Sequence, residues 1–377
     1  MGLVHACLNS LIPRILEFVL LSDILLCSHS LIVFRLLDDL MTAPVPTSPV
    51  RSPKIVLFLA ILNGLIGSPF SFATDLHREP CKLIGDVADF SRHQERQKAA
   101  LRAEQAAMRA QGLPVREVNE NELETEAGYL ARYLPGVRCE RITYESDGLK
   151  VTGFLWTPEY LPEGTKVPVI VFNRGGTGDE SKLRPNTQYG FDRFVREGYA
   201  VIGSQYRGND GSDGTDELGG SDVRDVIELA RLTATLPFID GKNMFALGYS
   251  RGAMMTLSAA RDGVKFNAVA LVGLPSDFRT PQFDRTFGKP SAGTESQRAS
   301  RSAILWAEKL DTPILLLQGG SDPLVSTEQQ TLPFAARLQK LGKPYELVIY
   351  DRDTHGIMIN GADRDRRILA WFRKFRR

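Results

Sequence analysis

The sequence predicts an α/β protein whose mainly parallel sheet is covered by helices on both faces. Two observations lead to this prediction. From about residue 140 onward, short strands and helices alternate repeatedly along the chain. Most of these strands are continuous apolar runs, as expected where both faces of a sheet are buried. In such a sheet, functional residues gather at the carboxyl ends of the strands.

The composition suits a globular protein with a large core. The 377 residues are 43% hydrophobic and 24% charged. The formal net charge is +1, so the overall charge indicates neither a nucleic-acid partner nor binding to an anionic surface.

Residues 41–73 have the pattern of a signal peptide. A short basic region at residues 51–54 precedes an uncharged apolar run at residues 55–66, and Ser71 and Ala73 then place small residues at the positions that a signal peptidase reads. The apolar run is shorter than a membrane-spanning helix requires. We therefore expect an exported protein, periplasmic or extracellular, with no stable membrane partner after cleavage. The alternative is an uncleaved segment that anchors the protein in the membrane.

Residues 1–40 are apolar, but charged residues and a proline interrupt every run long enough to span a membrane. Two interpretations stay open. The segment is either an upstream extension that is not translated, with Met41 as the true start, or a second anchor.

Residues 74–135 are predicted to be mostly helical. Residues 91–94 match a capping box, and the Ala- and Arg-rich sequence after them predicts a helix to Gln111. Gly112 and Pro114 then end it.

Cleavage after Ala73 would leave two of the four cysteines, Cys81 and Cys139. In an oxidising compartment this pair is expected to form a disulfide bond. The alternative is two separately buried thiols. The chain has no Cys-x-x-Cys motif, so we expect neither a zinc site nor a redox site.

The α/β domain is predicted to occupy residues 136–377. It opens with a β-hairpin formed by residues 141–145 and 151–156. The remaining elements follow from apolar runs and helical periodicity. Strands are expected at residues 167–172, 199–204, 244–249, 267–272, 313–318 and 345–350, and helices at 222–235, 253–260, 297–310, 327–342 and 363–376.

The most informative motif is Gly-x-Ser-x-Gly at residues 248–252, between an apolar strand and a helix-forming segment. In this context the motif is a nucleophile elbow, a strained turn that exposes the hydroxyl of Ser250. A serine hydroxyl needs a base to act as a nucleophile. Of the five histidines, only His355 lies C-terminal to the motif, so it is the expected base.

The acid that would orient this base is expected at Asp322. Asp322 follows the strand at residues 313–318, and His355 follows the strand at 345–350. Both therefore belong to the same edge of the sheet as Ser250. His355 would accept the serine proton and return it to the leaving group, while Asp322 would hold the imidazole. Asp351 and Asp353 are alternative carboxylates, but we expect both to face solvent.

An oxyanion formed at the substrate carbonyl needs hydrogen-bond donors. One is expected from the backbone N–H of Arg251 and another from the loop containing Arg174 and Gly175. Alternatively, the paired glycines at 175 and 176 only turn the chain. The acidic loop at residues 208–216 does not have the spacing of a calcium loop, so we expect no metal and no cofactor.

Four blocks of sequence resemble the catalytic domain of the prolyl oligopeptidase family of serine hydrolases. The resemblance covers about residues 140–377 and implies an α/β-hydrolase fold that cleaves peptide bonds through Ser250, His355 and Asp322. The blocks are residues 172–176, 205–208, 248–252, and 320–322 together with 354–356.

Three departures from the family pattern are visible. Arg174 stands where known members have tyrosine or histidine, which makes its guanidinium a candidate to bind the oxyanion or a substrate carboxylate. Ala253 replaces a second glycine. The β-propeller that restricts many members to short peptides has no counterpart, and the residues at 74–135 take its place.

Without a propeller, ester substrates become an alternative to peptides, and the same triad would serve a carboxylesterase. A third hypothesis is a binding protein on this fold without catalytic activity, which would require the loss of triad residues. Residues 277–301 are polar and rich in arginine. They are either an insertion that shapes the substrate pocket or a solvated loop.

Overall fold

The computed structural model describes residues 76–81, 90–110, 136–185, 191–287 and 293–377, together with Gly112 and Val115. The predicted leader at residues 1–40 and the predicted signal peptide at 41–73 lie outside the described residues.

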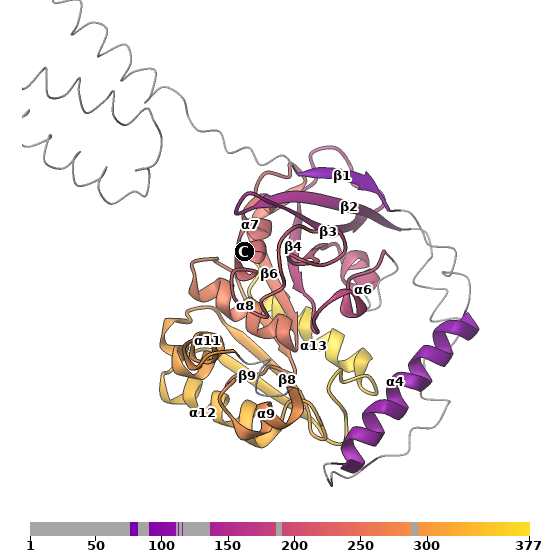
Figure 1. Cartoon of the computed structure of the whole chain (residues 1–377). Helices are drawn as coiled ribbons and strands as arrows, with labels where there is room; N and C mark the ends of the chain where they lie inside the picture. Colours follow the sequence, from indigo (N-terminus) through magenta and orange to yellow (C-terminus); the bar gives the residue numbers. More distant parts are fainter. Residues whose placement is uncertain are drawn as a thin grey trace, which may run out of the picture. The chain divides into compact units, whose positions relative to one another are not determined.

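In the described ranges, nine strands form one sheet in the order β1-β2-β3-β5-β4-β6-β7-β8-β9 (Figure 1). The first strands are antiparallel, and β5, β4, β6, β7, β8 and β9 are parallel to one another. The strands are β1 (His77–Pro80), β2 (Val137–Ser146), β3 (Leu149–Pro158), β4 (Val167–Asn173), β5 (Ala200–Ser204), β6 (Ile239–Tyr249), β7 (Val269–Val272), β8 (Ile314–Gly319) and β9 (Tyr345–Tyr350).

Helices cover both faces of this sheet, which confirms the predicted fold class. On one face, buried side chains of α7, α8 and α12 form one hydrophobic cluster with Val169 and Val171 of β4. On the other face, buried side chains of α6 and α13 form a second cluster with Ile170 and Phe172 of the same strand. Figure 1 shows α7 and α8 on one side of β4 and β6, with α6 on the other. The helices are α4 (Phe90–Ala110), α6 (Phe191–Arg196), α7 (Val223–Thr233), α8 (Arg251–Arg261), α9 (Pro281–Phe287), α11 (Glu295–Arg301), α12 (Leu332–Lys340) and α13 (Gly361–Lys374).

The predicted β-hairpin is present and is longer than expected. β2 and β3 pair along ten residues each. Asp147 and Gly148 connect them with φ angles of 52° and 74°. Asp-Gly with two positive φ angles is a turn that matches the twist of a hairpin.

Two predicted helical regions differ from the structure. Residues 77–80, in the segment expected to be mostly helical, form strand β1, which pairs with residues 140–143 of β2. The predicted helix at 297–310 ends at Arg301, because Ser302 has extended backbone angles. Short 3₁₀ turns follow at Ala303–Leu305 and Ala307–Lys309.

Strand β1 is also joined to β2 covalently. A disulfide bond links Cys81 to Cys139, with 5.4 Å between their Cα atoms and 58 positions between them in the chain. The backbone N–H of Cys81 donates to the carbonyl of Cys139 at 3.0 Å and continues the pairing of the two strands. The bond therefore connects the segment before the α/β domain to the first strand of that domain.

Candidate active site

The turn between β6 and α8 has the geometry of a nucleophile elbow. Ser250 separates the two elements and has φ 52° and ψ −121°, a strained conformation for a residue with a side chain. Neighbouring backbone passes close to the turn: a Cβ on Gly252 would overlap the carbonyl of Asn173, and one on Gly248 would overlap Gly252. The N–H of Ser250 donates to the carbonyl of Val272 at 2.8 Å.

His355 and Asp322 are in direct contact. Nδ1 of His355 lies 2.7 Å from Oδ2 of Asp322. The Asp322 side chain has no exposed area, whereas that of His355 is 17% exposed. Since an ionised carboxylate only accepts hydrogen bonds, this contact places the imidazole proton on Nδ1 and leaves Nε2 to accept a proton.

The carboxylate of Asp322 is fully engaged by further donors. Oδ1 accepts from the N–H groups of Leu324 and Val325, each at 2.9 Å. Oδ2 also accepts from Nε2 of Gln318 at 3.0 Å, and Oε1 of Gln318 accepts from the hydroxyl of Thr331 at 2.8 Å. We did not predict Gln318 or Thr331 as site residues. The available signal was a polar residue at the end of an otherwise apolar strand.

Ser250 and His355 both lie against the residues at the carboxyl end of β7. The carbonyl of Val272 binds the N–H of Ser250, and the next residue, Gly273, has φ 59°. A Cβ on Gly273 would lie 2.8 Å from Cε1 and 2.9 Å from Nδ1 of His355. The structure therefore brings the three predicted residues to one edge of the sheet, with the imidazole packed on a glycine.

Asp351 and Asp353 were both expected to face solvent, and only one of them does. Asp351 is exposed, as predicted. Asp353 has no exposed area, so the prediction that it faces solvent is wrong. Its carboxylate accepts from the N–H of Thr354 at 3.0 Å and from the N–H and side-chain amide of Asn360 at 2.9 and 3.0 Å. Asp353 therefore orders the loop that carries His355.

Gly175 lies against the elbow. A Cβ on Gly175 would lie 3.2 Å from Cβ of Ser250 and 3.1 Å from the carbonyl oxygen of Tyr249. On the other side of Ser250, Arg251 is the first residue of α8. Its N–H has no acceptor within the helix, because the first N–H groups of a helix precede any available carbonyl. The backbone of Gly175 and the first residue of α8 thus lie on either side of the serine.

The side chain of Arg174 does not face a substrate. It has no exposed area. Its guanidinium donates to the carbonyl of Gln205 at 2.8 and 3.3 Å and to that of Gly175 at 3.2 Å, and it lies 5.0 Å from the ring centre of Tyr206. Contrary to the expectation of a contact with the oxyanion or the substrate, the guanidinium therefore binds the backbone carbonyls of Gln205 and Gly175.

The guanidinium of Arg251 forms a buried charge network that sequence analysis missed. It contacts both Asp216 and Asp222, and Asp222 has no exposed area. Burial alone would lower the pKa of Arg251, but the charges of Asp222 and Asp216 offset this effect, so the pKa is raised and the group is ionised. Burial would likewise raise the pKa of Asp216, but Arg251 outweighs it and lowers that pKa to about 2.

Comparison with known proteins agrees with this architecture. The model of the prolyl oligopeptidase family matches residues 186–376, which is just over half of the chain. The chain belongs to the prolyl oligopeptidase family. It is therefore a serine hydrolase, and its sheet is that of the α/β-hydrolase fold.

Among curated relatives, the uncharacterized peptidase YtmA of Bacillus subtilis is 27% identical over 229 residues, which cover 58% of this chain and 86% of the relative. Human dipeptidyl peptidase 8 is 27% identical over 251 residues, which cover 62% of this chain but only 27% of the relative. The chain thus spans most of the length of one relative and about a quarter of the other.

Solved structures show the same fold. Acylaminoacyl peptidase from Pyrococcus horikoshii superposes with a TM-score of 0.56 at 23% identity, over 67% of this chain and 44% of that one. A puromycin-hydrolyzing peptidase from Mycobacterium tuberculosis superposes with a TM-score of 0.55 at 25% identity, over 63% of this chain and 39% of that one. The chain spans less than half of the length of each of these two structures.

The polar region at residues 277–301 is partly described in this family member. It forms α9 and α11, and its described part is not a solvated loop. Phe278 and Phe283 are buried with their ring centres 4.4 Å apart, and Arg301 donates to the carbonyl of Glu217 at 2.8 Å. These contacts attach the region to the core and to Glu217, the residue after the acidic loop.

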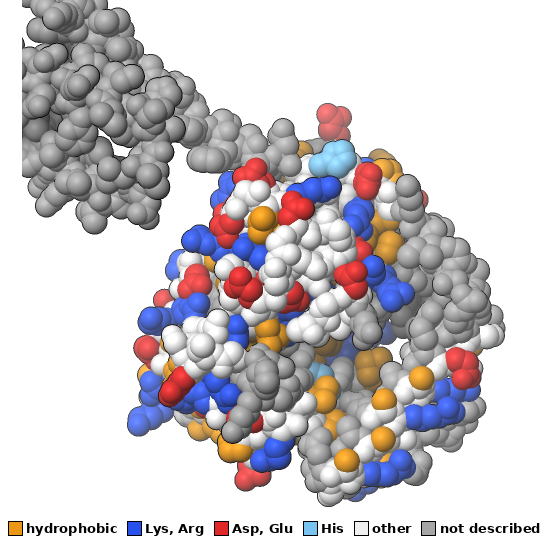
Figure 2. All heavy atoms as spheres, in the orientation of Figure 1, with side chains coloured by type: hydrophobic (Ala, Val, Ile, Leu, Met, Phe, Trp, Pro, Cys, Tyr) orange, Lys and Arg blue, Asp and Glu red, His pale blue; other side chains and the backbone are white. Residues whose placement is uncertain are grey.

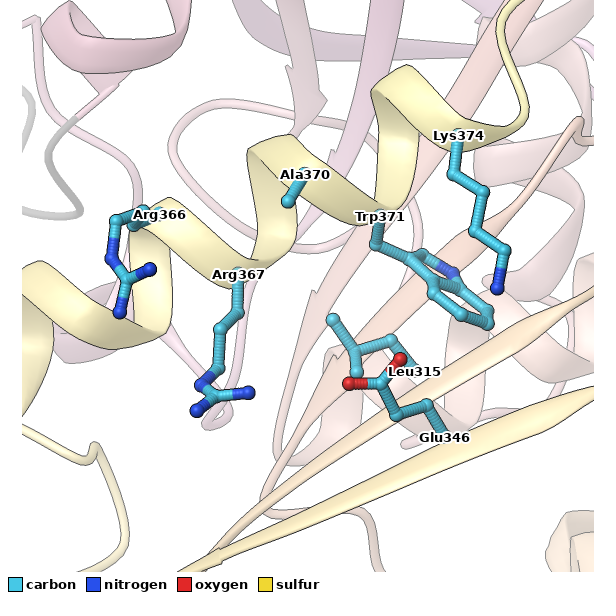
Figure 3. A pocket seen from close by; sticks show the side chains of 7 residues that line it. All are labelled: Leu315, Glu346, Arg366, Arg367, Ala370, Trp371 and Lys374. Atoms are coloured by element: carbon cyan, nitrogen blue, oxygen red, sulfur yellow. The ribbon is translucent and has the colours of Figure 1, made fainter.

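A pocket of about 240 Å³ lies between α13 and strands β8 and β9. Figure 3 shows Arg367, Trp371 and Lys374 projecting from α13 towards Leu315 and Glu346. Leu315 and Glu346 are the second residues of β8 and β9. The pocket is therefore at the amino ends of these strands, away from the edge where Asp322 and His355 lie.

The surface of this family member carries charges of both signs. Figure 2 shows basic and acidic side chains interspersed on the face in view, among the described residues. No helix in the described ranges is both long enough and apolar enough to cross a membrane.

Proposed function

We propose that this chain is an exported serine peptidase that cleaves peptide bonds through an acyl-enzyme on Ser250. The contact of 2.7 Å between His355 Nδ1 and Asp322 Oδ2, beside the serine of the elbow, carries the proposal. The names of relatives support a peptide substrate, since YtmA and dipeptidyl peptidase 8 are both called peptidases.

The first half of the reaction acylates the enzyme. Oγ of Ser250 attacks the carbonyl carbon of the scissile bond, and its proton passes to Nε2 of His355. The carbonyl electron pair moves to oxygen and gives a tetrahedral oxyanion. When the oxyanion collapses, the C–N bond breaks and the amine leaves with the proton from Nε2. Asp322 stays ionised and stabilises the transient imidazolium.

The second half releases the acyl group. Water gives a proton to Nε2 of His355 and attacks the ester carbon, which forms a second tetrahedral oxyanion. Its collapse breaks the bond to Oγ, and the proton on Nε2 returns to Ser250. In both halves, the N–H groups of Arg251 and Gly175 stabilise the oxyanion, a contribution of about 10²–10³ in rate constant for one donor.

Replacement of the nucleophile tests the proposal. Ser250→Ala is expected to abolish turnover and labelling by a fluorophosphonate probe. The matched control is Ser258→Ala. Ser258 is also buried on α8, and its hydroxyl donates a weak hydrogen bond to the sulfur of Met254 at 3.6 Å. Retained turnover in Ser250→Ala would refute the assignment of the nucleophile.

The substrate class is tested on the unmodified enzyme. Rates on aminoacyl p-nitroanilides and on p-nitrophenyl acyl esters are measured in parallel. A peptidase cleaves the anilides at a measurable rate that is lost in Ser250→Ala, even though the more reactive esters are cleaved faster. Ester cleavage without detectable anilide cleavage would assign the chain to the carboxylesterases instead, because the same triad serves both reactions.

A further inference from the structure

We propose that the side chain of Arg251 is a positioning residue that holds the loop containing Gly175 against the nucleophile elbow. The backbone of the same residue supplies one N–H to the oxyanion, so a single residue would join both halves of the oxyanion site. The inference rests on the proposed function, since it concerns the groups that would stabilise the oxyanion.

The contacts of Arg251 reach across two loops. Its guanidinium is 3% exposed. Nη1 donates to the carbonyl of Gly176 at 3.0 Å and to Asp216 at 2.8 Å. Nη2 donates to the other carboxylate oxygen of Asp216 at 2.6 Å and also contacts Asp222. The paired contact with one carboxylate fixes the plane of the guanidinium, so its bond to Gly176 has a defined direction.

The loop at residues 174–176, called the glycine loop below, has three successive carbonyls that accept hydrogen bonds from side chains of the protein. The carbonyl of Arg174 accepts from the hydroxyl of Tyr206 at 3.1 Å. The carbonyl of Gly175 accepts from the Arg174 guanidinium at 3.2 Å, and that of Gly176 accepts from Arg251 at 3.0 Å. In a trans peptide the C=O and N–H groups point in opposite directions. The N–H of Gly175 therefore points away from the hydroxyl of Tyr206.

The partners of Arg251 are themselves held. Asp222 accepts from the N–H of Gly219 at 3.0 and 3.1 Å. Asp216 accepts from the side-chain amide of Asn209 and the N–H of Leu218, both at 3.1 Å. Arg251 thus links the glycine loop by hydrogen bonds to a loop that is held in place by its own hydrogen bonds. A lysine carries the charge but cannot make these contacts from one planar group.

The test compares two changes in this network with a matched control. Arg251→Lys keeps the charge, and Asp216→Asn removes one carboxylate. The control is Asp210→Asn, because Asp210 lies on the same loop and pairs with Arg141 and Lys182 at 2.7 and 2.9 Å. The concentration of active enzyme is measured by titration with a fluorophosphonate, so that unfolded protein does not enter kcat.

We expect Arg251→Lys to lower kcat roughly 10- to 100-fold while KM changes less than about threefold, because an oxyanion contact acts mainly in the transition state. Affinity for a trifluoromethyl ketone, which forms a tetrahedral oxyanion with the serine, is expected to fall by a similar factor. Asp216→Asn is expected to show a smaller loss of the same kind, and Asp210→Asn to keep kcat within about twofold of the unmodified enzyme.

Unchanged kcat and unchanged ketone affinity in Arg251→Lys would overturn the inference, and so would a change in KM alone. If Arg251→Lys does not fold, Asp216→Asn decides by the same two measurements. Neither result affects the proposed function, which fails if Ser250→Ala keeps its turnover or if the unmodified enzyme cleaves esters but not anilides.

Discussion

Asp322 and Asp353 follow neighbouring strands and are both buried, but they have different partners. Asp322 contacts the imidazole of His355, and its remaining acceptor positions are filled by Gln318 and two backbone N–H groups. Asp353 accepts only from the backbone and side chain of its own loop. One carboxylate is therefore placed to orient the base, and the other to fold the loop that carries it.

This difference predicts opposite effects for two conservative changes. Asp322→Asn is expected to lower kcat by roughly 10⁴ while the protein still folds, because an amide stabilises the wrong tautomer of His355. Asp353→Asn is expected to cost about 1–3 kcal/mol of unfolding free energy with a much smaller effect on kcat, because an amide N–H₂ would face backbone N–H groups. Kinetics and urea unfolding of both variants distinguish the two roles; the reverse pattern would mean that Asp353 is the acid.

At the scale of elements, the strands and the order of the site residues could be predicted from the sequence, because they depend on local patterns. Continuous apolar runs mark strands buried on two faces, and chain order then places Asp322 and His355 at strand ends. Strand β1 could not be predicted in this way, because its partner lies about sixty positions away in β2. The burial of Arg174 depends on a residue 31 positions away, and the contacts of Arg251 on residues 29 to 75 positions away, so no local pattern reveals them.

The loop between β5 and α7 gives a prediction for pH dependence. The pKa of Asp216 in the folded protein is about 2, against an ordinary value of 3.8. A lowered pKa contributes stability that is fully present above the ordinary value and is lost as the pH falls towards the folded value. The contribution is about 2 kcal/mol. We therefore expect Asp216→Asn to be less stable than the unmodified protein above pH 4.

The same comparison contains its own control. As the pH falls from about 4 towards about 2, the difference in unfolding free energy between the unmodified protein and Asp216→Asn is expected to shrink, because protonation progressively removes the stabilising charge of Asp216. Denaturant unfolding at several pH values measures this difference. A difference that stays constant over this range would show that the charge of Asp216 contributes nothing to stability through its contact with Arg251.

At the scale of the whole molecule, the segment before the α/β domain is attached to the sheet in two ways. Strand β1 has four residues, and all four are exposed. A short exposed strand at the edge of a sheet contributes little burial to hold itself in place. The disulfide bond between Cys81 and Cys139 adds a covalent link at the end of this strand. We propose that the bond forms because the protein is exported into an oxidising compartment.

Removal of the bond is expected to lower stability without stopping catalysis. Closing a loop of 58 residues contributes about 4 kcal/mol in the chain-entropy model. The double variant Cys81→Ser, Cys139→Ser should therefore unfold at a lower denaturant concentration, and the amide hydrogens of β1 should exchange faster while those of β6 to β8 stay protected. Catalysis should persist, because Ser250, Asp322 and His355 follow other strands, namely β6, β8 and β9. Alkylation and intact-mass analysis of the unmodified protein, purified from the exporting compartment, check the premise, and two free thiols there would contradict both the bond and the proposed export.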